Sequence, residues 1–469
     1  MDFGSVDRLA RALGPDAALH AVGGWVRDRW LGRSGGDLDL ASALLPGEAM
    51  ARARAAGFRV IPTGLQHGTI TVLVGEAPVE LTTFRGDGDY RDGRRPESVR
   101  LGVALEEDLA RRDFTINALA LPVAALEDPD WRKRLVDPFE GRADLEAGLI
   151  RAVGDPLRRF AEDGLRPLRA CRFASQLGFS VEADTLAAIP PRLEVAAKVS
   201  IERVFVELTK LLCGRDPARG LRLLESTGLL DLWMPELRPL VGCPQNRHHR
   251  FDVWEHTLHA LTFDPPLPPD QAWGLLLHDL GKPATRTLGA DGEAHFVGHE
   301  KLSEDLADQV LQRLKAPNRL RDRVAALIRL HGEHPEPSWS DAAFRRLLKR
   351  LLDAGVEPEA WELFRLRDHL GKGWSDGHPD GRSGTQWKED TLRFWAEICG
   401  RLESVRFPGM TVKELALDGT ALMAQAGRPG GPWLGQLQKH LLERVLEDPG
   451  LNTEEGLRQA AEAWLRVHR

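Results

Sequence analysis

The sequence is poor in cysteine and has no long apolar run. Its cysteines are widely separated and form no Cys-x-x-Cys pair: Cys171, Cys213, Cys243 and Cys399. This spacing argues against a disulfide framework and against a thiolate zinc site, and it fits a reducing compartment. No hydrophobic stretch approaches the length of a membrane span, and the first residues lack the basic and apolar segments of a signal peptide. We therefore expect a cytoplasmic protein with no membrane segment.

The chain also lacks an excess of positive charge. Its 469 residues include 63 Lys and Arg against 70 Asp and Glu, a formal net charge of −7. A protein with this balance is not expected to coat nucleic acid indiscriminately. The segment 151–180, however, has three more arginines than acidic residues, which leaves a local basic groove possible.

The length exceeds what one hydrophobic core usually serves, so we expect two to four domains. Short β-like runs alternate with helices up to residue 150, and from there on almost every segment has helical periodicity. The predicted fold class is α+β, a small mixed domain followed by an all-α remainder. Strands are expected at 18–22, 37–41, 69–74, 79–83 and 135–137, and helices at 46–57 and 105–119.

The most informative stretch runs from Gly23 to Asp39. Gly23 and Gly24 precede a predicted helix, where they would let backbone N–H groups approach a phosphate, with Arg27 adding positive charge. Asp37 and Asp39 are two residues apart on a predicted strand, so their carboxylates should share one face. Paired carboxylates repel unless a cation lies between them, and oxygen-only ligands favour Mg²⁺. A lone Asp-x-Asp is usually a solvated turn, but the glycine motif upstream favours a metal and nucleotide site.

Glu80 lies on a later predicted strand, with Val79 and Leu81 on the opposite face. A third carboxylate beside the aspartate pair would complete a two-metal site and help to activate an attacking hydroxyl. The alternative is an edge-strand glutamate that faces water. The next segment, 84–99, is rich in glycine and alternating charges and contains Tyr90, so we expect a mobile loop.

Two further polar segments are candidates for nucleotide contacts. The adjacent Arg111 and Arg112 could bind triphosphate oxygens, while Asp113 or Asn117 could bind ribose hydroxyls. The alternative is a solvated, charged helix face.

The second polar segment begins at Asp155-Pro156, a helix start signal. Asp163 and Arg166 are three residues apart, which predicts neighbours on one helix face. They could form a simple salt bridge. They could instead recognise a nucleobase, with Asp accepting from an exocyclic amine and Arg donating to the adjacent ring nitrogen. Cytosine and adenine offer that pattern, whereas uracil and guanine reverse it.

Four motifs, in this order, closely resemble those of the bacterial class II tRNA nucleotidyltransferases, or CCA-adding enzymes. They are Gly-Gly-x-Val-Arg-Asp at 23–28, Asp-x-Asp at 37–39, Arg-Arg-Asp-Phe-Thr-Ile-Asn-Ala at 111–118 and Glu-Asp-x-x-Arg at 162–166. The resemblance implies a polymerase-β-like head followed by a helical neck, body and tail. It also implies Mg²⁺-dependent transfer of CMP and AMP from CTP and ATP to tRNA 3′ ends. The expected domains are 1–150, 151–225, 226–370 and 371–469, the last of which binds tRNA.

The resemblance also implies residue roles. Asp37 and Asp39 would hold the metal ions, and Glu162 would orient Arg166. The predicted catalytic residues are Asp37, Asp39 and Glu80, and the predicted nucleotide-binding residues are Gly23, Gly24, Arg27, Arg111, Arg112, Asp113, Asn117, Glu162, Asp163, Arg166 and Arg169. Pro167 departs from the family pattern and could kink the helix that carries Arg166.

The segment 84–99 matches a family loop that helps to switch from C to A addition. Its length favours complete CCA addition or A addition alone, so an A-adding (or CC-adding) enzyme of a split system is the alternative. A poly(A) polymerase has a similar head, but the acidic balance and the absence of a basic tail count against it.

A second set of candidate ligands lies in the helical region: His256, His278, Asp279, His299 and His331. Imidazole with carboxylate suits Mn, Ni, Fe or Zn. The segment resembles HD-superfamily phosphohydrolases, in which a distant aspartate completes the site, and Asp368 is our candidate. This resemblance implies phosphodiesterase or phosphatase activity, for example on a 2′,3′-cyclic phosphate at a damaged tRNA end. An HD hydrolase with an inactive head is therefore the alternative from another functional class.

The remaining segments carry less information. Residues 181–245 are expected to be linking helices, and 371–384 has the composition of an exposed linker. The tail after residue 415 predicts a turn and two or three amphipathic helices. The sequence leaves the oligomeric state open.

Overall fold

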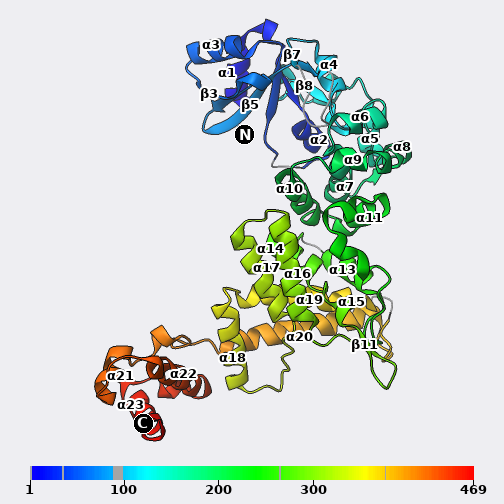
Figure 1. Ribbon diagram of the computed structural model, residues 1–469. Coiled ribbons are helices and arrows are strands. Elements are labelled where there is room, and N and C mark those ends of the chain that lie inside the picture. Colours follow the sequence, from blue (N-terminus) through cyan, green and yellow to red (C-terminus); the bar gives the residue numbers. More distant parts are fainter. Residues whose placement is uncertain (1–2, 34–35, 88–98, 264–265, 375–376, 469) are drawn as a thin grey trace. The chain divides into compact units, whose positions relative to one another are not determined.

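The computed structural model describes residues 3–33, 36–87, 99–263, 266–374 and 377–468 (Figure 1). It divides into two compact units, Met1–Pro235 and Glu236–Arg469. A search of these described residues finds no helix that is long and apolar enough to cross a membrane.

The first unit is built on a six-stranded sheet in the order β3-β4-β5-β2-β1-β8. Its strands are β1 (His20–Val22), β2 (Asp39–Ser42), β3 (Arg59–Gly64), β4 (Thr69–Val74), β5 (Ala77–Thr83) and β8 (Ala120–Pro122). β2 and β5 run parallel with Asp39 in register with Glu80, and the other neighbours are antiparallel. Residues in register on adjacent strands share a face, so the sheet places these two carboxylates side by side.

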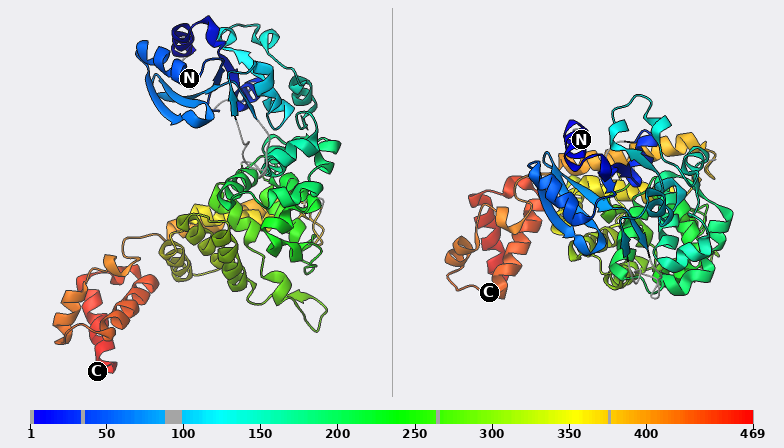
Figure 2. Two further views of the ribbon diagram at one scale, coloured as in Figure 1. Left: turned by 45° about the horizontal axis from the view of Figure 1, so that its top comes forward. Right: turned by 90° about the horizontal axis from the view of Figure 1, so that it is seen from above.

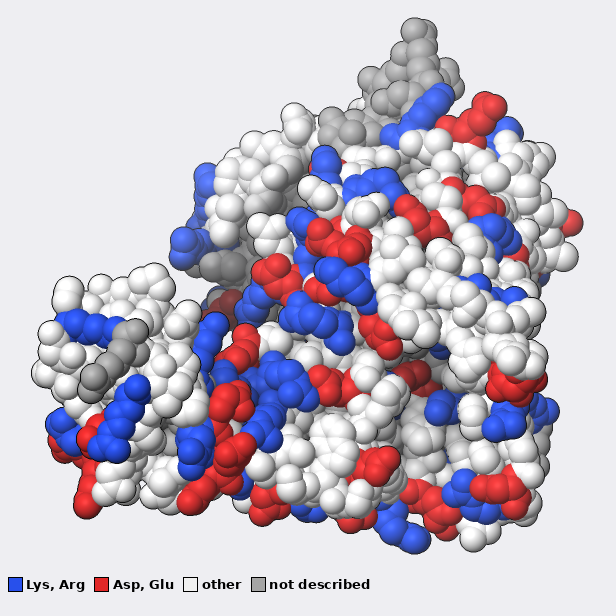
Figure 3. Space-filling model, turned by 60° about the horizontal axis from the view of Figure 1, so that its bottom comes forward, with Lys and Arg blue, Asp and Glu red and all other residues white. Residues whose placement is uncertain are grey.

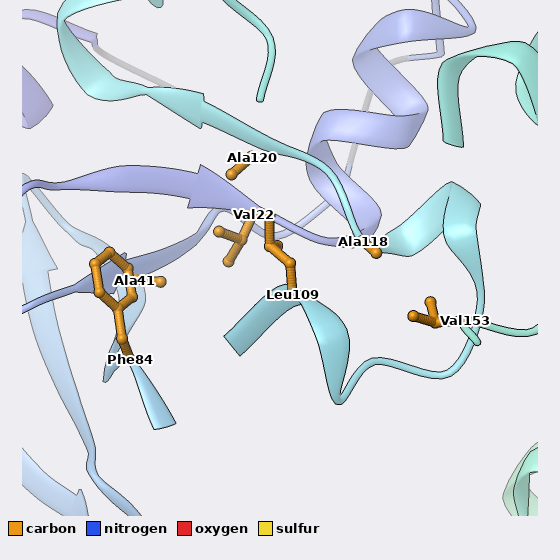
Figure 4. Close-up of a cluster of buried hydrophobic side chains, with 7 residues drawn as sticks. All are labelled: Val22, Ala41, Phe84, Leu109, Ala118, Ala120 and Val153. Atoms are coloured by element: carbon orange, nitrogen blue, oxygen red, sulfur yellow. The ribbon is translucent and has the colours of Figure 1, made fainter. Parts of the chain in front are cut away.

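A cluster of buried side chains fixes the edge of this sheet (Figure 4). Its members come from β1, β2, the end of β5, the helix α4 (Leu105–Ala110) and nearby segments: Val22, Ala41, Phe84, Leu109, Ala118, Ala120 and Val153. None of these side chains exposes more than 3% of its surface. The cluster therefore holds the segment that carries Arg111 to Asn117 firmly against β1 and β2.

Helices make up most of the rest of the first unit; in Figure 2 the first three are blue, like most of the sheet, and the later ones run from cyan to green. Besides α4 they are α1 (Phe3–Leu13), α2 (Gly24–Trp30), α3 (Pro46–Ala55), α5 (Gly141–Ala147), α6 (Pro156–Glu162), α7 (Arg166–Leu177), α8 (Ala183–Ala187), α9 (Leu193–Ala196), α10 (Ile201–Leu212), α11 (Pro217–Thr227) and α12 (Leu229–Trp233). α7 packs against both α10 and α11. Short strand pairs are β6 (Arg85–Asp87) with β7 (Val99–Leu101), and β9 (Leu149–Ile150) with β10 (Ser180–Val181).

In its described residues the second unit is helical apart from one small hairpin, β11 (Thr287–Leu288) with β12 (Ala294–His295). Its helices are α13 (Val253–Leu261), α14 (Pro269–Leu277), α15 (Lys282–Thr285), α16 (His299–Arg313), α17 (Asn318–Leu330), α18 (Asp341–Asp353), α19 (Pro358–Gly371), α20 (Gly384–Ser404), α21 (Gly419–Ala426), α22 (Pro432–Glu447) and α23 (Glu454–Val467). α13 packs on α14 and α19, and α17 packs on α14 and α16. On the face drawn in Figure 3, basic and acidic side chains are interspersed, as expected of a chain with a small net charge.

The predicted α+β fold class is confirmed, and so are most of the predicted strands. β4 has the predicted bounds, and β5 contains the predicted 79–83. The strand predicted at 37–41 begins only at Asp39, so Asp37 lies in the irregular segment before it. The strand predicted at 135–137 is wrong, because Val136 forms only an isolated bridge with Ala120. β3 was not predicted, because consecutive exposed residues interrupt the alternation of buried and exposed positions along the strand.

The helix predicted over 105–119 ends early, at Ala110. The Thr115 N–H donates to the Arg151 carbonyl at 2.9 Å, and the Val153 N–H donates to the Asp113 carbonyl at 3.2 Å. Because these backbone groups pair with a distant segment, they do not extend the helix. Tertiary contacts thus override a local helical pattern.

The segment 371–384 is only in part the exposed linker that its composition predicted, with Pro379, Asp380, Gly381 and Ser383 exposed. In its described part, Gly371, Gly373 and Gly384 are buried. The ring of Phe251 occupies the place where a side chain on Gly373 would lie. Glycine here serves close packing. The core of the predicted mobile loop, 88–98 with Tyr90, lies outside the described residues, and β6 and β7 pair on either side of it.

Candidate active site

Of the three carboxylates expected to hold metal ions, the sheet pairs Asp39 with the exposed Glu80, but in the described residues the three do not form a group whose ligand atoms lie within 4.8 Å of one another. Asp39 is the first residue of β2 and is half-buried, and Glu80 lies beside it on β5. Burial raises the pKa of Asp39 to about 6, with further increases from the charges of Glu80 and Asp37 and a decrease from Arg112. This mutual repulsion is what a divalent cation between oxygen ligands relieves, so the donor set fits a hard ion. Asp37 itself is exposed, just before the strand.

Gly23 acts differently from the prediction. The Gly23 N–H already donates to the Leu119 carbonyl at 3.3 Å and is therefore not available to a phosphate. Gly23 has a φ of +70°, and a Cβ there would lie 2.7 Å from Nη1 of Arg112. Glycine is needed at this position because Arg112 lies directly against the backbone.

Arg111 and Arg112 are held by a carboxylate that sequence reasoning missed. Asp108 is 1% exposed; its Oδ1 accepts from Nη2 of Arg111 at 2.7 Å, and its Oδ2 from Nη2 of Arg112 at 3.3 Å. Burial would raise the pKa of Asp108, but the charges of the two arginines keep it below its ordinary value. The sequence did contain a signal for these contacts. Asp108 precedes Arg111 by three residues and Arg112 by four, the spacings at which side chains are neighbours on a helix.

The predicted ribose-binding residues form a connected buried network. Nη1 of Arg27 donates to Oδ1 of Asn117 at 2.7 Å, and Nδ2 of Asn117 donates to Oδ1 of Asp113 at 3.0 Å. Oδ2 of Asp113 accepts from Nε of Arg169 at 2.8 Å. Although burial alone would raise the pKa of Asp113, the charge of Arg169 and the bond from Asn117 lower it well below its ordinary range. The network therefore keeps Asp113 ionised and fixes all four side chains.

The structure corrects the prediction that Asp163 and Arg166 share a helix. α6 ends at Glu162 and α7 begins at Arg166, with Asp163 in an extended conformation between them. Gly164 lies in this break, where a Cβ would lie 2.4 Å from the Val195 carbonyl oxygen, so a larger residue would not fit. Pro167 does not kink the helix, because it lies in the first turn of α7, where no N–H is required.

Arg166 is held from three sides. Its Nη1 donates to Oε2 of Glu162 at 2.6 Å and to the Arg159 carbonyl at 2.9 Å, and its Nη2 donates to the Arg111 carbonyl at 2.9 Å. Within the described part of the chain, none of these bonds uses Nε. One donor edge of the guanidinium thus remains available for a ligand.

A single cleft of about 790 Å³ joins these groups. The predicted residues that line it are Gly23, Gly24, Arg27, Asp39, Arg111, Arg112, Asp113, Asn117, Asp163, Arg166 and Arg169. Asp37, Glu80 and Glu162 are not among its lining residues. Four lining residues beyond those predicted come from α7 and α10: Arg172, Phe173, Arg203 and Lys210. Cations dominate the lining, so the cleft suits a polyanionic ligand.

The second unit brings its predicted ligands together in two adjacent groups. His256, His278 and Asp368 form one, and Asp279, His299 and His331 form the other. In each group the ligand atoms lie within 4.8 Å of one another. Oδ2 of Asp279 lies 3.1 Å from Nε2 of His278, and its Oδ1 lies 3.6 Å from Nε2 of His299, so Asp279 links the two groups.

The backbone orients three of the four imidazoles. Nδ1 of His278 lies 2.8 Å from the Leu275 carbonyl, and Nδ1 of His299 lies 2.7 Å from the Phe296 carbonyl. Nδ1 of His331 contacts the Ile328 carbonyl in the same way. A carbonyl at Nδ1 favours the tautomer that leaves Nε2 as an acceptor, the arrangement typical of metal-binding histidines.

This second site opens into a cavity of about 530 Å³. Its lining includes the basic residues Lys282, Arg365 and Lys372 beside Asp279 and Asp368. Nζ of Lys282 lies 2.7 Å from Oδ2 of Asp279. Cations beside metal-type ligands make the cavity suitable for a phosphate ester.

Family models match three parts of the chain. They are described as the poly A polymerase head domain (residues 19–151), a probable RNA and SrmB-binding site of polymerase A (178–240) and the HD domain (253–362).

Characterised relatives match nearly the whole chain. The CCA-adding enzyme of Geobacillus thermodenitrificans (strain NG80-2) is 34% identical over 448 residues, covering 95% of this chain and 92% of the relative. The CCA-adding enzyme of Levilactobacillus brevis is 44% identical over 301 residues, covering 64% and 68%. Among solved structures, the Bacillus stearothermophilus CCA-adding enzyme in complex with CTP has a TM-score of 0.69 and 28% identity, covering 99% of this chain and 97% of that chain. The Thermotoga maritima CCA-adding enzyme complexed with tRNA shares the fold, with a TM-score of 0.53, 19% identity and coverage of 99% and 96%.

Proposed function

The chain belongs to the family of CCA-adding enzymes, as its four motifs indicated, and we propose that it adds CMP and AMP to the 3′ ends of tRNA. The observation that carries this proposal is one cleft that contains Asp39, the paired arginines Arg111 and Arg112, and the base-recognition pair Asp163 and Arg166. A metal-type carboxylate, a triphosphate-binding edge and a donor–acceptor pair are the three parts that untemplated nucleotide selection and transfer require.

Nucleotidyltransferases of this family use a divalent metal ion, and we propose Mg²⁺ held by Asp37 and Asp39, with Glu80 beside them. The bound ion would neutralise charge on the triphosphate and on the departing pyrophosphate. The tRNA 3′-hydroxyl attacks the α-phosphate in line, forming a new P–O bond as the bond to the β-phosphate oxygen breaks. In this proposal Glu80 accepts the hydroxyl proton, and Arg111 and Arg112 hold the triphosphate.

The base-recognition pair supplies selectivity. The Asp163 carboxylate accepts from the exocyclic amine of cytosine or adenine, and the free edge of Arg166 donates to the adjacent ring nitrogen. Uracil and guanine would present a carbonyl to the carboxylate and an N–H to the guanidinium, so both contacts would be lost. Glu162 and the two carbonyls around Arg166 fix its orientation.

Extension assays with each nucleotide separately test this function. CTP alone should extend tRNA that lacks CCA, and ATP alone should extend tRNA that ends in CC. An enzyme of a split system would perform only one of the two reactions. Equal incorporation of UTP and GTP would overturn the proposal.

We propose a second activity, phosphate ester hydrolysis, for the second unit. The observation behind it is the pair of ligand groups linked by Asp279 beside three cations. Mixed imidazole and carboxylate ligands suit Mn, Ni or Zn. Such an ion would activate water and polarise the phosphoryl group, while Lys282, Arg365 and Lys372 bind the phosphate oxygens.

Formation of nucleoside monophosphate from 2′,3′-cyclic nucleotides, and phosphate release from nucleoside monophosphates, measure this activity in protein loaded with each metal. Absence of hydrolysis with all three metals would refute it. A substitution in the head that abolishes nucleotide incorporation but leaves phosphate ester hydrolysis intact would show that the head is catalytically active.

The proposed domain organisation remains a head at 1–150, a neck at 151–225, a body at 226–370 and a tRNA-binding tail at 371–469. A tRNA substrate and scattered, unpaired cysteines support a cytoplasmic location.

A further inference from the structure

Two of the histidines that line the cavity of the second unit stand apart from the candidate metal ligands. They are His249, in the segment before α13, and His334, after α17. Neither belongs to the two ligand groups found among the described residues. We propose that Nε2 of His249 accepts a hydrogen bond from a substrate hydroxyl, so that the site selects ribose phosphate esters with a free hydroxyl next to the phosphate. This inference rests on the proposed phosphate ester hydrolysis.

A neighbouring asparagine fixes which nitrogen of His249 carries the proton. Nδ1 of His249 lies 3.0 Å from Oδ1 of Asn246, and the same oxygen accepts from the His248 N–H at 3.2 Å. A backbone N–H only donates, so the shared Asn246 atom is the amide oxygen and not the amide nitrogen. Nδ1 of His249 is therefore the donor. In a neutral ring this leaves Nε2 as an acceptor.

The surroundings of His249 keep its ring neutral and its Nε2 open to the cavity. Burial lowers the pKa of the imidazole, with a further decrease from the charge of Lys282. The ring of His256 lies against it edge to face, with the centroids 5.3 Å apart. In the part of the chain that the structure describes, no hydrogen bond reaches Nε2. The acceptor thus remains available to a ligand.

The segment that carries His249 is anchored beside the cations proposed to bind phosphate. The Arg250 N–H donates to the Lys372 carbonyl at 3.1 Å, and Nζ of Lys282 donates to Oε1 of Gln245 at 2.8 Å. Lys282 and Lys372 line the cavity together with His249. An acceptor fixed next to these cations meets the part of a substrate that adjoins its phosphate.

The phosphate itself does not satisfy this acceptor. Phosphate oxygens are acceptors too, so they have no hydrogen to give to Nε2 of His249. A ribose hydroxyl is a donor, and in a ribonucleoside 2′- or 3′-monophosphate it lies on the carbon next to the ester. A 2′-deoxyribonucleoside 3′-monophosphate lacks this hydroxyl and leaves the acceptor unpaired, which disfavours its binding.

His334 has the opposite tautomer and provides a matched comparison in the same cavity. Its Nδ1 lies 3.3 Å from Nη2 of Arg365. A guanidinium group only donates, so Nδ1 of His334 accepts and its Nε2 carries the proton. A donor suits a phosphate oxygen, which every ester has. Loss of His334 should therefore weaken ribose and deoxyribose esters alike, whereas loss of His249 should affect the ribose ester alone.

The experiment compares uridine 3′-monophosphate with 2′-deoxyuridine 3′-monophosphate, which differ by one hydroxyl. Uracil is used because the proposed base-recognition pair of the first cleft rejects it. Phosphate release is measured with the metal-loaded protein, and binding by calorimetry with the full-length protein before metal is added, when no hydrolysis occurs. Wild type should favour the ribose ester about tenfold, the range of one hydrogen bond. His249→Phe keeps a ring against His256 and should abolish this preference.

Three further variants control the result. His334→Phe should lower kcat/KM for both esters and keep their ratio. His440→Phe changes a half-buried histidine on α22 that is not among the cavity-lining residues, and it should alter neither ester. Asn246→Ala releases the ring of His249 from its fixed tautomer and should give an intermediate preference. It decides the question if His249→Phe fails to fold.

Equal treatment of the two esters by wild type, or an unchanged preference in His249→Phe, would overturn the inference. Bound metal, measured by elemental analysis, should stay at the wild-type level in His249→Phe; its loss would make His249 a metal ligand and would also overturn the inference. A wild type that binds the ribose ester preferentially but hydrolyses neither ester refutes the proposed hydrolysis and leaves the inference standing, so the two failures are distinguishable.

Discussion

The two units build metal-type sites by different means. In the first, the carboxylates lie at the edge of a sheet, where the parallel register of β2 and β5 brings Asp39 beside Glu80. In the second, separate helices and the turn after α14 contribute individual ligands, and Asp279 links two groups of them. The first set contains only oxygen and suits a hard ion such as Mg²⁺, whereas the second mixes imidazole with carboxylate and suits transition metals.

The surroundings of the two sites differ as well. Arginines line the first cleft and are themselves paired with buried carboxylates such as Asp108, so their geometry is fixed before a ligand binds. In the second site the backbone carbonyls orient the imidazoles. A polyanion that must be placed for in-line transfer requires rigid forked donors, whereas hydrolysis chiefly requires orientated metal ligands. The comparison predicts that each site can be disabled without affecting the other.

The largest effect is expected from Asp39→Ala. Removing the central carboxylate should lower nucleotide incorporation at least about 10³-fold, roughly 4 kcal/mol of transition-state stabilisation. Phosphate release by the second unit should stay within twofold. Incorporation of labelled CMP and AMP measures the first effect, and the exposed Glu76→Ala is the control that should change neither. Loss of both activities would break the comparison.

Asp279→Asn addresses the second site in the same way. It keeps the volume of the side chain but removes the charge shared by the two ligand groups, so hydrolysis should fall by about 10²-fold or more. Bound metal, measured by elemental analysis, should fall with it, while nucleotide incorporation remains. Asp291→Asn, on the hairpin turn, is the control. Full metal content in Asp279→Asn would contradict the assignment.

A smaller effect is expected from Asp108→Asn, which touches the triphosphate edge only through Arg111 and Arg112. Loss of the buried charge should release both guanidinium groups and raise KM for CTP and ATP about tenfold, with less change in kcat. Steady-state kinetics with both nucleotides measure this split. A loss of kcat with an unchanged KM would show that Asp108 does not act on nucleotide binding.

The smallest effect concerns stability in the second unit. Trp361 is fully buried, and its Nε1 donates to the Leu330 carbonyl at 2.9 Å. Trp361→Phe leaves that carbonyl without its donor and should lower the free energy of unfolding by about 1–3 kcal/mol. Thermal or denaturant unfolding measures the loss, and incorporation by the first unit at 25 °C should be unchanged.

The predictions from sequence succeeded where one residue type and its immediate neighbours carried the signal. The glycine pair, the Arg-Arg-Asp segment and the His-Asp pair were found because each is a local pattern, and most of the named residues of the first unit line one cleft. Prediction from sequence failed where a structural feature depends on contact with a residue far away along the chain. Asp163 and Arg166 satisfied helical spacing, yet one helix ends before Asp163 and the next begins at Arg166, with Gly164 packed closely on the Val195 backbone between them.

Residues that act through others were also missed. Asp108 carries no motif, and its importance follows from its contacts with Arg111 and Arg112. His299 and His331 were seen as part of a histidine-rich region, but only the structure joins them with Asp279 into a second ligand group.

By itself the sequence determined the α+β fold class and the family, because hydrophobic periodicity and short motifs are written in consecutive residues. The tertiary structure alone decided which side chains meet, and it paired Arg203 with Asp163 and left Arg166 to Glu162. The physical reason is that a hydrogen bond or ion pair depends on distance in space. Residues forty or more positions apart reach that distance only when the whole core has packed.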